Sequence, residues 1–367
     1  MQQVKRLLLL HIPTAQCNLQ CKYCYVKQRN EWKKEKKSFA RSPEFIAKAL
    51  SKDRVGGTCY VNLTAGGETL LDPEVLELIE LLLEEHFVEV VTNGTLTERF
   101  RVLAKLPPQK LKRLVFKFSY HYDELKRLGI IDRFFENVNL MKQCGCSFTI
   151  EMVGSDNQIE EIDELKRLCM QKLGAVPHVT LPRNEKNTNL DIYTKLERSK
   201  YIEIWENNFN SKFLDLKLKL LGEKRNEYCY AGCWSLFINL GTGFAQPCYG
   251  QLINQNIFVD INKPIKWIAV GKCCSQPYCY NGHAFLTFGI IPELDMPTYF
   301  DVRNRNCEDR DWIVNEVKDF YKSKLYESNE EYSKKEKVNN EIKKAINLVP
   351  SIYLTTKMLM KKRLEND

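Results

Sequence analysis

The alternation of short apolar runs with longer amphipathic segments constrains the fold of this chain more than any other feature. We expect strands at 4–12, 59–65, 87–93, 113–120, 147–153 and 177–182. Helical patterns lie between them, for example at 73–86 and 159–173. Such alternation predicts parallel β/α units, arranged as an open doubly wound sheet or as a partial barrel. In both arrangements ligands bind at the carboxyl ends of the strands.

Three cysteines directly follow the first expected strand. Cys17, Cys21 and Cys24 have the spacing C-x3-C-x2-C in "CNLQCKYCY". No signal-peptide core with a cleavage site precedes them, which favours the reducing cytoplasm, where clustered cysteines serve metals or catalysis. One loop with this spacing can place three thiolates around an iron–sulfur cube and leave the fourth iron without a protein ligand. A four-ligand structural zinc site and a trio of unligated thiols are the alternatives.

The chain carries a formal net charge of +8, with much of the excess at 27–37 and 101–127. These stretches read as a solvated surface, or as a surface for an acidic peptide, a phosphorylated substrate or an acidic electron donor. We expect no nucleic acid partner, because no recognition-helix or base-stacking pattern accompanies the charge. No stretch reaches the roughly 20 apolar residues of a membrane span.

The cysteine motif, together with "AGGETLL" at 65–71, resembles the radical S-adenosylmethionine (SAM) superfamily over roughly residues 5–185. The second motif follows the second expected strand, where that family has it. The resemblance implies an α/β fold with a partial (β/α)6 barrel. It also implies that Cys17, Cys21 and Cys24 hold a 4Fe–4S cluster whose open iron binds SAM. Such an enzyme reductively cleaves SAM to a 5'-deoxyadenosyl radical, which abstracts a hydrogen atom from its substrate, and takes its electron from a flavodoxin- or ferredoxin-type donor.

By the same resemblance, Gly66, Gly67 and Glu68 form the turn that binds the methionine part of SAM. The glycines permit close backbone approach, and Glu68 would accept a hydrogen bond from the SAM amino group. Tyr23 occupies the position that packs against adenine in the family, although a core aromatic would also fit.

Further candidates lie at the ends of later strands. In the fourth, alternation puts Lys117, Ser119 and His121 on one face, which is the interior in a barrel. Ser119 resembles the hydroxyl that contacts the ribose of SAM, and His121 is a candidate catalytic residue or a structural histidine. Asn93 lies near the site or belongs only to a turn. Arg183 is a candidate partner of the SAM carboxylate or an exposed loop arginine.

A second group of cysteines lies between residues 229 and 283. Its first segment reads C-x-A-G, then an alternating apolar strand, then G-x4-C, like the half-motif shared by SPASM and twitch extensions of radical SAM enzymes. By that resemblance Cys229 and Cys248 are ligands of one auxiliary iron–sulfur cluster, expected to be 4Fe–4S, and Cys274 and Cys279 are the favoured pair to complete it. A full SPASM extension has more cysteines and two clusters, so the twitch-like form fits better.

Cys233, Cys273 and Cys307 are candidate substitutes as ligands. Cys233 is also a candidate catalytic thiol, because some radical SAM epimerases use a cysteine to donate a hydrogen atom to the substrate radical. His283 follows Cys279 closely enough to be a ligand, but its position favours a supporting or structural role.

We therefore expect a partial barrel at 1–190, a helical bridge at 191–228, a small α+β auxiliary-cluster domain at 229–310 and a helical tail at 311–367. The tail should pack on the barrel. Its last stretch is basic and amphipathic, yet we do not expect it to contact a membrane.

Two substrate classes are open. The first is a ribosomal peptide that the enzyme would crosslink, epimerise or oxidise, although only sixteen residues precede Cys17 and we expect no N-terminal leader-binding domain. The second is a sugar or another small polar metabolite, modified by a dehydrogenase or epimerase. A non-enzymatic iron–sulfur carrier or scaffold is a third reading, against which the "GGE" turn argues.

Overall fold

The computed structural model of the protein describes residues 3–32, 39–186, 191–272 and 274–364, with side chains to residue 360 in the last helix. Cys273, one of the candidate ligands, lies outside the described residues.

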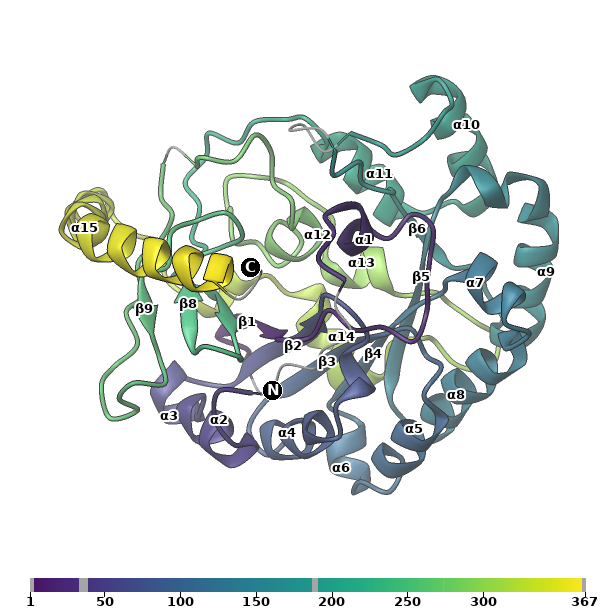
Figure 1. Cartoon of the computed structure of the whole chain (residues 1–367), viewed down its shortest axis with the longest axis horizontal. Helices are drawn as coiled ribbons and strands as arrows, with labels where there is room; N and C mark the ends of the chain where they lie inside the picture. The colour runs from purple at the N-terminus through teal and green to yellow at the C-terminus, as the bar shows by residue number, and fades with distance from the viewer. Residues whose placement is uncertain (1–2, 33–38, 187–190, 273, 365–367) are drawn as a thin grey trace.

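Six parallel strands form the sheet that the alternation predicts, in the order β6-β5-β4-β3-β2-β1. They are β1 (Arg6–Ile12), β2 (Cys59–Ala65), β3 (Phe87–Thr92), β4 (Leu114–Ser119), β5 (Ser147–Val153) and β6 (His178–Thr180). The sheet curves and stays partly open, with helices around its outer side (Figure 1). The expected partial barrel is therefore confirmed.

The outer layer follows the first half of the chain. It contains α2 (Pro43–Ala49), α3 (Lys52–Val55), α4 (Glu74–Leu82), α5 (Thr97–Leu103), α6 (Pro108–Leu111), α7 (Tyr122–Arg127), α8 (Ile131–Gln143) and α9 (Ile162–Leu173), with 3-10 turns η1 (Thr69–Leu71) and η2 (Asp156–Glu161). The short α1 (Tyr25–Gln28) instead lies in the cysteine loop at the carboxyl ends of the strands. In α4 the residues Val75, Leu78 and Ile79 are fully buried, as helical spacing of apolar side chains toward a sheet requires.

The second half of the chain extends the sheet and covers its inner side. β7 (Ser235–Asn239) pairs in parallel with β1, and β8 (Phe244–Gln246) and β9 (Gln255–Asn256) continue antiparallel. The helices here are α10 (Arg198–Phe209), α11 (Lys212–Leu220), α12 (Gly282–Phe285), α13 (Tyr299–Arg303), α14 (Asn315–Lys322), the turn η3 (Leu325–Ser328) and the long α15 (Lys334–Leu364). Among the described residues, no helix combines the length and apolar character that crossing a bilayer requires.

Both faces of β1 are buried, which explains its uninterrupted apolar sequence. Leu8 and Leu10 pack with the outer helices, whereas Leu7 and Leu9 belong to a second core built from residues of α11 to α14. This second core fills the inner side of the sheet and leaves a hollow at the carboxyl ends of the strands.

Candidate functional site

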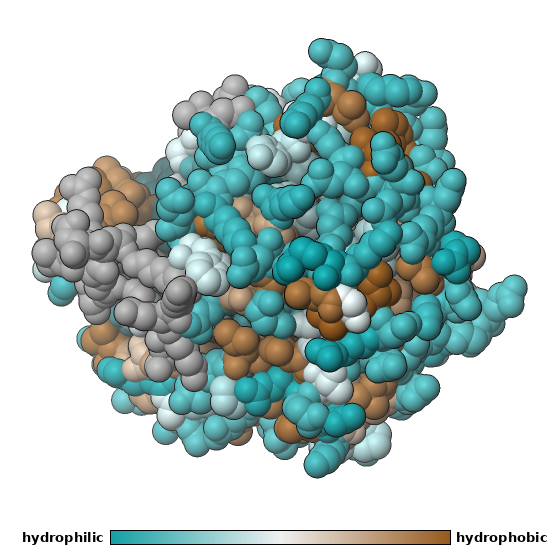
Figure 2. Space-filling view, turned by 45° about the vertical axis from the view of Figure 1, so that its right-hand side comes forward, coloured by the Kyte–Doolittle hydropathy of each residue, from teal (hydrophilic) through white to brown (hydrophobic). Residues whose placement is uncertain are grey.

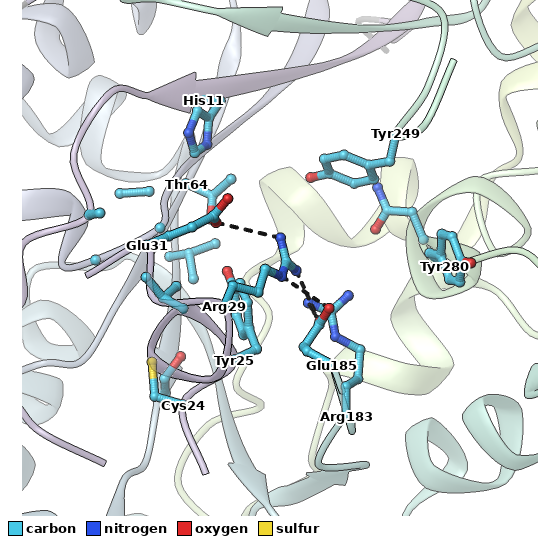
Figure 3. A pocket seen from close by; sticks show the side chains of 18 of the residues that line it. His11, Cys24, Tyr25, Arg29, Glu31, Thr64, Arg183, Glu185, Tyr249 and Tyr280 are labelled. Atoms are coloured by element: carbon cyan, nitrogen blue, oxygen red, sulfur yellow. Dashed lines mark hydrogen bonds and ion pairs between the residues drawn. The ribbon is translucent and has the colours of Figure 1, made fainter. Parts of the chain in front are cut away.

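A cavity of about 1910 Å³ lies at the carboxyl ends of the strands (Figure 3). Its walls come from the cysteine loop after β1, the turn after β2, the end of β4 and the distant segment from Gln276 to His283. Residues of the predicted SAM site and of the predicted auxiliary segment therefore face one shared space.

The three cysteines of the first motif, Cys17, Cys21 and Cys24, all line this cavity. The backbone N–H of Leu19 and the side-chain amide of Asn93 both donate to the Cys17 sulfur, at 3.4 and 3.7 Å. Burial raises the pKa of Cys17 to about 11, and burial together with the adjacent thiols raises the pKa of Cys21. Crowded, desolvated thiols, one of which accepts N–H donors at its sulfur, suit a bound metal, because the metal favours the thiolate form. The donor set thus fits a 4Fe–4S cluster.

The Gly66–Gly67 turn is locked against the backbone that leads into this loop. The Gly67 N–H donates to the Thr14 carbonyl (3.0 Å), and the Glu68 N–H donates to the Gln16 carbonyl (2.8 Å). A Cβ atom on Gly67 would lie 1.6 Å from the Gln16 oxygen, so only glycine permits this approach. Both glycines also line the cavity.

Glu68 lies beneath the turn rather than on the cavity wall, and it is 2% exposed. Its carboxylate accepts hydrogen bonds from the Thr92 hydroxyl (2.6 Å) and from the backbone N–H groups of Asn93 (2.7 Å) and Leu70 (3.0 Å). Burial raises its pKa, against the effect of these hydrogen bonds. The carboxylate ties the end of β3 to the turn, and its hydrogen bond to SAM stays a prediction.

Tyr23 and His121, predicted from separate segments, are in contact on the cavity wall. The Tyr23 hydroxyl lies 2.8 Å from Nδ1 of His121, and the ring centroids are 5.9 Å apart. Burial lowers the pKa of His121 to about 4, so the imidazole is neutral and can accept the hydroxyl proton at Nδ1. Ser119 and Lys117 line the cavity too, as the alternation predicts. The roles of these residues stay predictions.

Arg183 faces the cavity as part of a charged cluster that the sequence did not indicate (Figure 3). Glu185 pairs with Arg183 and with Arg29, both at 3.0 Å. The Tyr25 ring packs against both guanidinium groups, at 4.7 Å from Arg183 and 5.0 Å from Arg29. Arg183 is thus already held by a carboxylate, and its contact with SAM stays a prediction.

Lys217, on α11, is a cavity residue that the sequence analysis missed. Its ammonium group lies 5.4 Å from the centre of the Phe213 ring, and no ion pair joins it to a carboxylate of the described residues. Burial, with the positive charges of Arg183 and Lys117, lowers its pKa to about 7. By contrast, Lys117 pairs with Glu151 at 2.8 Å. An amine without an acidic partner suits the anionic group of a ligand.

The four assigned auxiliary cysteines lie near one another. Burial raises the pKa of Cys248, and the neighbouring thiols of Cys279, Cys229 and Cys274 add to the shift. Gln251 donates to the Cys274 sulfur at 3.8 Å, and Cys279 lines the cavity. Four half-buried thiols fit a complete cluster, which stays a prediction.

In neither cysteine group do the sulfur atoms come as close together as the ligands of a single metal ion. Among the described residues, no three His, Cys, Asp or Glu side chains are grouped for a single metal. A four-iron cube places each thiolate on a different iron and therefore needs wider spacing.

Cys233 does not line the cavity. Its sulfur lies 3.0 Å from the Tyr332 hydroxyl, and its carbonyl accepts a hydrogen bond from Arg6 at the start of β1. This is the amino end of the strands, opposite the site, so the placement argues against the predicted hydrogen-atom donor. The Cys307 thiol donates a hydrogen bond to the Leu173 carbonyl (3.4 Å), and Cys307 does not line the cavity either.

His283 does face the cavity, with its ring edge-on to Phe213 at 5.5 Å between centroids. Its Nδ1 is buried without a hydrogen-bond partner among the described residues. Its ligand role stays a prediction.

Comparison with known proteins agrees with this architecture. Residues 11–169 match the model of the radical SAM superfamily. A "Probable GTP 3',8-cyclase" of Methanococcus maripaludis strain C7 is 23% identical over 272 residues, which cover 69% of this chain and 87% of the relative. Its counterpart in strain C5 is 22% identical over 274 residues, with the same coverage.

Among solved structures, "Native anSMEcpe with bound AdoMet and Cp18Cys peptide" aligns with a TM-score of 0.51 and 17% identity, covering 88% of this chain and 96% of that chain. SuiB of Streptococcus suis aligns with a TM-score of 0.46 and 16% identity, over 72% of this chain and 66% of that chain. The chain contains a radical SAM superfamily domain, folded as the partly open barrel of that superfamily. Such a domain supports a 4Fe–4S cluster and SAM as cofactors.

Proposed function

We propose that this protein is a radical SAM enzyme that crosslinks, epimerises or oxidises a peptide. One observation carries the proposal: the three-cysteine loop, the Gly66–Gly67 turn and the segment of Cys279 share a single cavity. Its volume of about 1910 Å³ exceeds the roughly 300–1,000 Å³ of ordinary small-molecule pockets, which leaves room for a peptide segment beside SAM. The cluster and SAM, when bound, would supply the radical that removes a substrate hydrogen atom.

The residues of the chain position and shield this chemistry. Cys17, Cys21 and Cys24 would hold the cluster, and the rigid contact of Gly67 with Gln16 would fix the SAM turn relative to it. The paired rings of Tyr23 and His121 would form the wall beside SAM and keep it dry.

Substrate recognition would rest on the opposite wall. Lys217 would bind a carboxylate of the peptide, since no carboxylate of the described residues pairs with it. Tyr249 and Tyr280, which lie across the cavity from Cys24, would contact peptide side chains (Figure 3). The fold likeness to anSMEcpe, solved with bound AdoMet and the Cp18Cys peptide, supports this substrate class.

Cys229, Cys248, Cys274 and Cys279 would hold one auxiliary 4Fe–4S cluster of the twitch type at the edge of the cavity. An acidic flavodoxin- or ferredoxin-type protein would deliver the electron to the basic surface of the chain.

A second candidate is a radical enzyme that acts on a sugar, a nucleotide or another small polar metabolite. Relatives named as probable GTP 3',8-cyclases over 69% of the chain favour it. An anionic metabolite would also suit Lys217.

The two candidates separate in one assay. Anaerobically reconstituted protein is incubated with SAM, a chemical reductant and either acidic synthetic peptides or nucleotides and sugar nucleotides. We expect peptides to accelerate 5'-deoxyadenosine formation and to change in mass or take up deuterium. The Cys17→Ala/Cys21→Ala/Cys24→Ala variant is the control and should form none. Acceleration by the small metabolites alone would replace the peptide proposal with the second candidate.

A further inference from the structure

The long helix α15 packs on the protein with its polar face. Asn340 is buried and exchanges two hydrogen bonds with the backbone of Ala269, at 2.9 and 3.0 Å. Lys344 donates to the Val270 carbonyl (2.7 Å), and the Thr355 hydroxyl accepts the Ile253 N–H (3.0 Å). These positions recur at helical spacing and define the side of α15 that touches the body.

The opposite side of α15 is apolar and faces away from the body. Its largest exposed side chains are 52–75% accessible and follow each other at helical spacing: Val338 60%, Ile342 52%, Ile346 70%, Val349 75%, Tyr353 63% and Met360 61%. More than half of the exposed large hydrophobic side chains of the described residues lie on this one helix. A surface helix normally turns such a stripe toward the core, so α15 is reversed.

Pro350 stands inside α15 and interrupts its hydrogen-bond ladder, so the stripe has two parts. Val338, Ile342, Ile346 and Val349 precede this proline, and Tyr353 and Met360 follow it. α15 begins at the left edge of Figure 1 and its last part runs inward, and Figure 2 shows hydrophobic surface at the left edge. From residue 338 to 349 the first part extends over roughly 17 Å at 1.5 Å per residue, so one partner surface could contact this part at once.

Charge indicates which partner this is. Residues 334–360 contain six lysines and two glutamates, a formal net charge of +4. A second copy of the chain would bring an equal positive charge against the stripe, whereas an anionic lipid surface attracts it. Interfacial helices bury an apolar face among lipid headgroups while their lysines reach the phosphates.

We infer that α15 docks this protein on an anionic lipid surface. This reverses the expectation drawn from the sequence that the last stretch of the tail does not contact a membrane. Lys357 and Met358 of the same helix also line the cavity, so docking would hold that wall of the candidate site beside the lipid.

The test is flotation of the full-length protein with vesicles of phosphatidylcholine alone or of equimolar phosphatidylcholine and phosphatidylglycerol. We expect at least tenfold more protein on the anionic vesicles, with binding that falls as salt rises. Ile346→Ser/Val349→Ser should lower that binding about tenfold without changing the charge. The matched control Val102→Ser/Leu128→Ser alters exposed apolar residues outside α15 and should bind like the wild type.

Three results would overturn the inference. The first is no flotation of the wild type. The second is flotation unchanged in Ile346→Ser/Val349→Ser, which would assign binding to charge alone. The third is a concentration-dependent dimer or an acidic protein complex that the same variant abolishes, without vesicle binding. The single variant Val349→Thr, which keeps a β-branched side chain, serves if the double variant fails to fold.

Discussion

Asn93 holds its side-chain amide 3.7 Å from the sulfur of Cys17. The same amide donates to Asn18 at 2.8 Å, and its oxygen accepts the Thr95 N–H at 3.1 Å. Asn93, at the end of β3, thus supplies a fixed N–H donor to the first cysteine loop. A role in a turn alone would not require this contact with a cysteine.

Removing this donor should lower the reduction potential of the bound cluster, since N–H groups on the sulfurs favour the more reduced state. For Asn93→Leu we predict a decrease on the order of tens of millivolts, where about 59 mV corresponds to a tenfold change for one electron. A redox titration followed by electron paramagnetic resonance measures it. Thr95→Val, which removes a partner of Asn93 but no donor to sulfur, is the control. Equal potentials in Asn93→Leu and wild type would contradict the prediction.

Gly67→Ala should destabilise the protein by about 2–4 kcal/mol, because the new Cβ would overlap the Gln16 carbonyl and displace the cysteine loop. Gly66→Ala is the matched control, since its Cβ would lie 3.4 Å from the Thr14 oxygen. We expect it to cost less than about 1 kcal/mol. Denaturant unfolding of the metal-free proteins compares the two, and equal costs would refute the account of the turn.

Stability should fall as the pH drops below about 6.5, in part through His86. This buried ring accepts the Cys59 N–H at Nδ1 (3.1 Å) and donates from Nε2 to the Leu50 carbonyl (2.8 Å), an arrangement only the neutral form permits. Burial lowers the pKa of His86 in the folded state. As the pH falls, the unfolded chain therefore binds the proton before the folded protein does, and this stabilises the unfolded chain. His86→Gln should flatten the slope between pH 7 and 5 by at most about 1.4 kcal/mol per unit. An unchanged slope of denaturant midpoint against pH would count against this.

Lys217→Met should raise the KM for an acidic substrate about tenfold and leave kcat within about threefold, because the amine would bind the substrate without reacting. Lys217→Arg should keep most of the affinity. Lys219→Met, an exposed lysine on the same helix, should behave like the wild type. Steady-state formation of 5'-deoxyadenosine reports both constants, and a loss confined to kcat would exclude a binding role.

The strands of the barrel were predictable because their burial on both faces leaves continuous apolar runs, as in β1. The pairing of β7 with β1 was not predictable, because the two strands are more than 220 residues apart and a local sequence pattern does not show which strands pair. The three-cysteine loop was predictable for the opposite reason: its ligands lie within eight positions of one loop.

The remaining cavity residues depend on long-range contacts. Arg29 belongs to a run that reads as solvated surface, yet it pairs with Glu185, 156 positions away. Lys217 lies in "LDLKLKLL", whose apolar–polar alternation is typical of a half-buried strand, and only the packing of α11 turns this lysine into the cavity. Cys233 carries a thiol suited to hydrogen-atom donation, but it lies at the amino end of β1, away from the cavity. Sequence spacing does not show at which end of the sheet a residue lies.

Iron and sulfide per chain after anaerobic reconstitution test the central claim most directly. The account predicts about eight of each for the wild type and about four for Cys17→Ala/Cys21→Ala/Cys24→Ala, as two four-iron clusters require. Cys229→Ala/Cys248→Ala should likewise leave about four, held by the first loop. About four irons in the wild type, falling to none in the first variant, would contradict the auxiliary cluster and the function proposed for the second half of the chain.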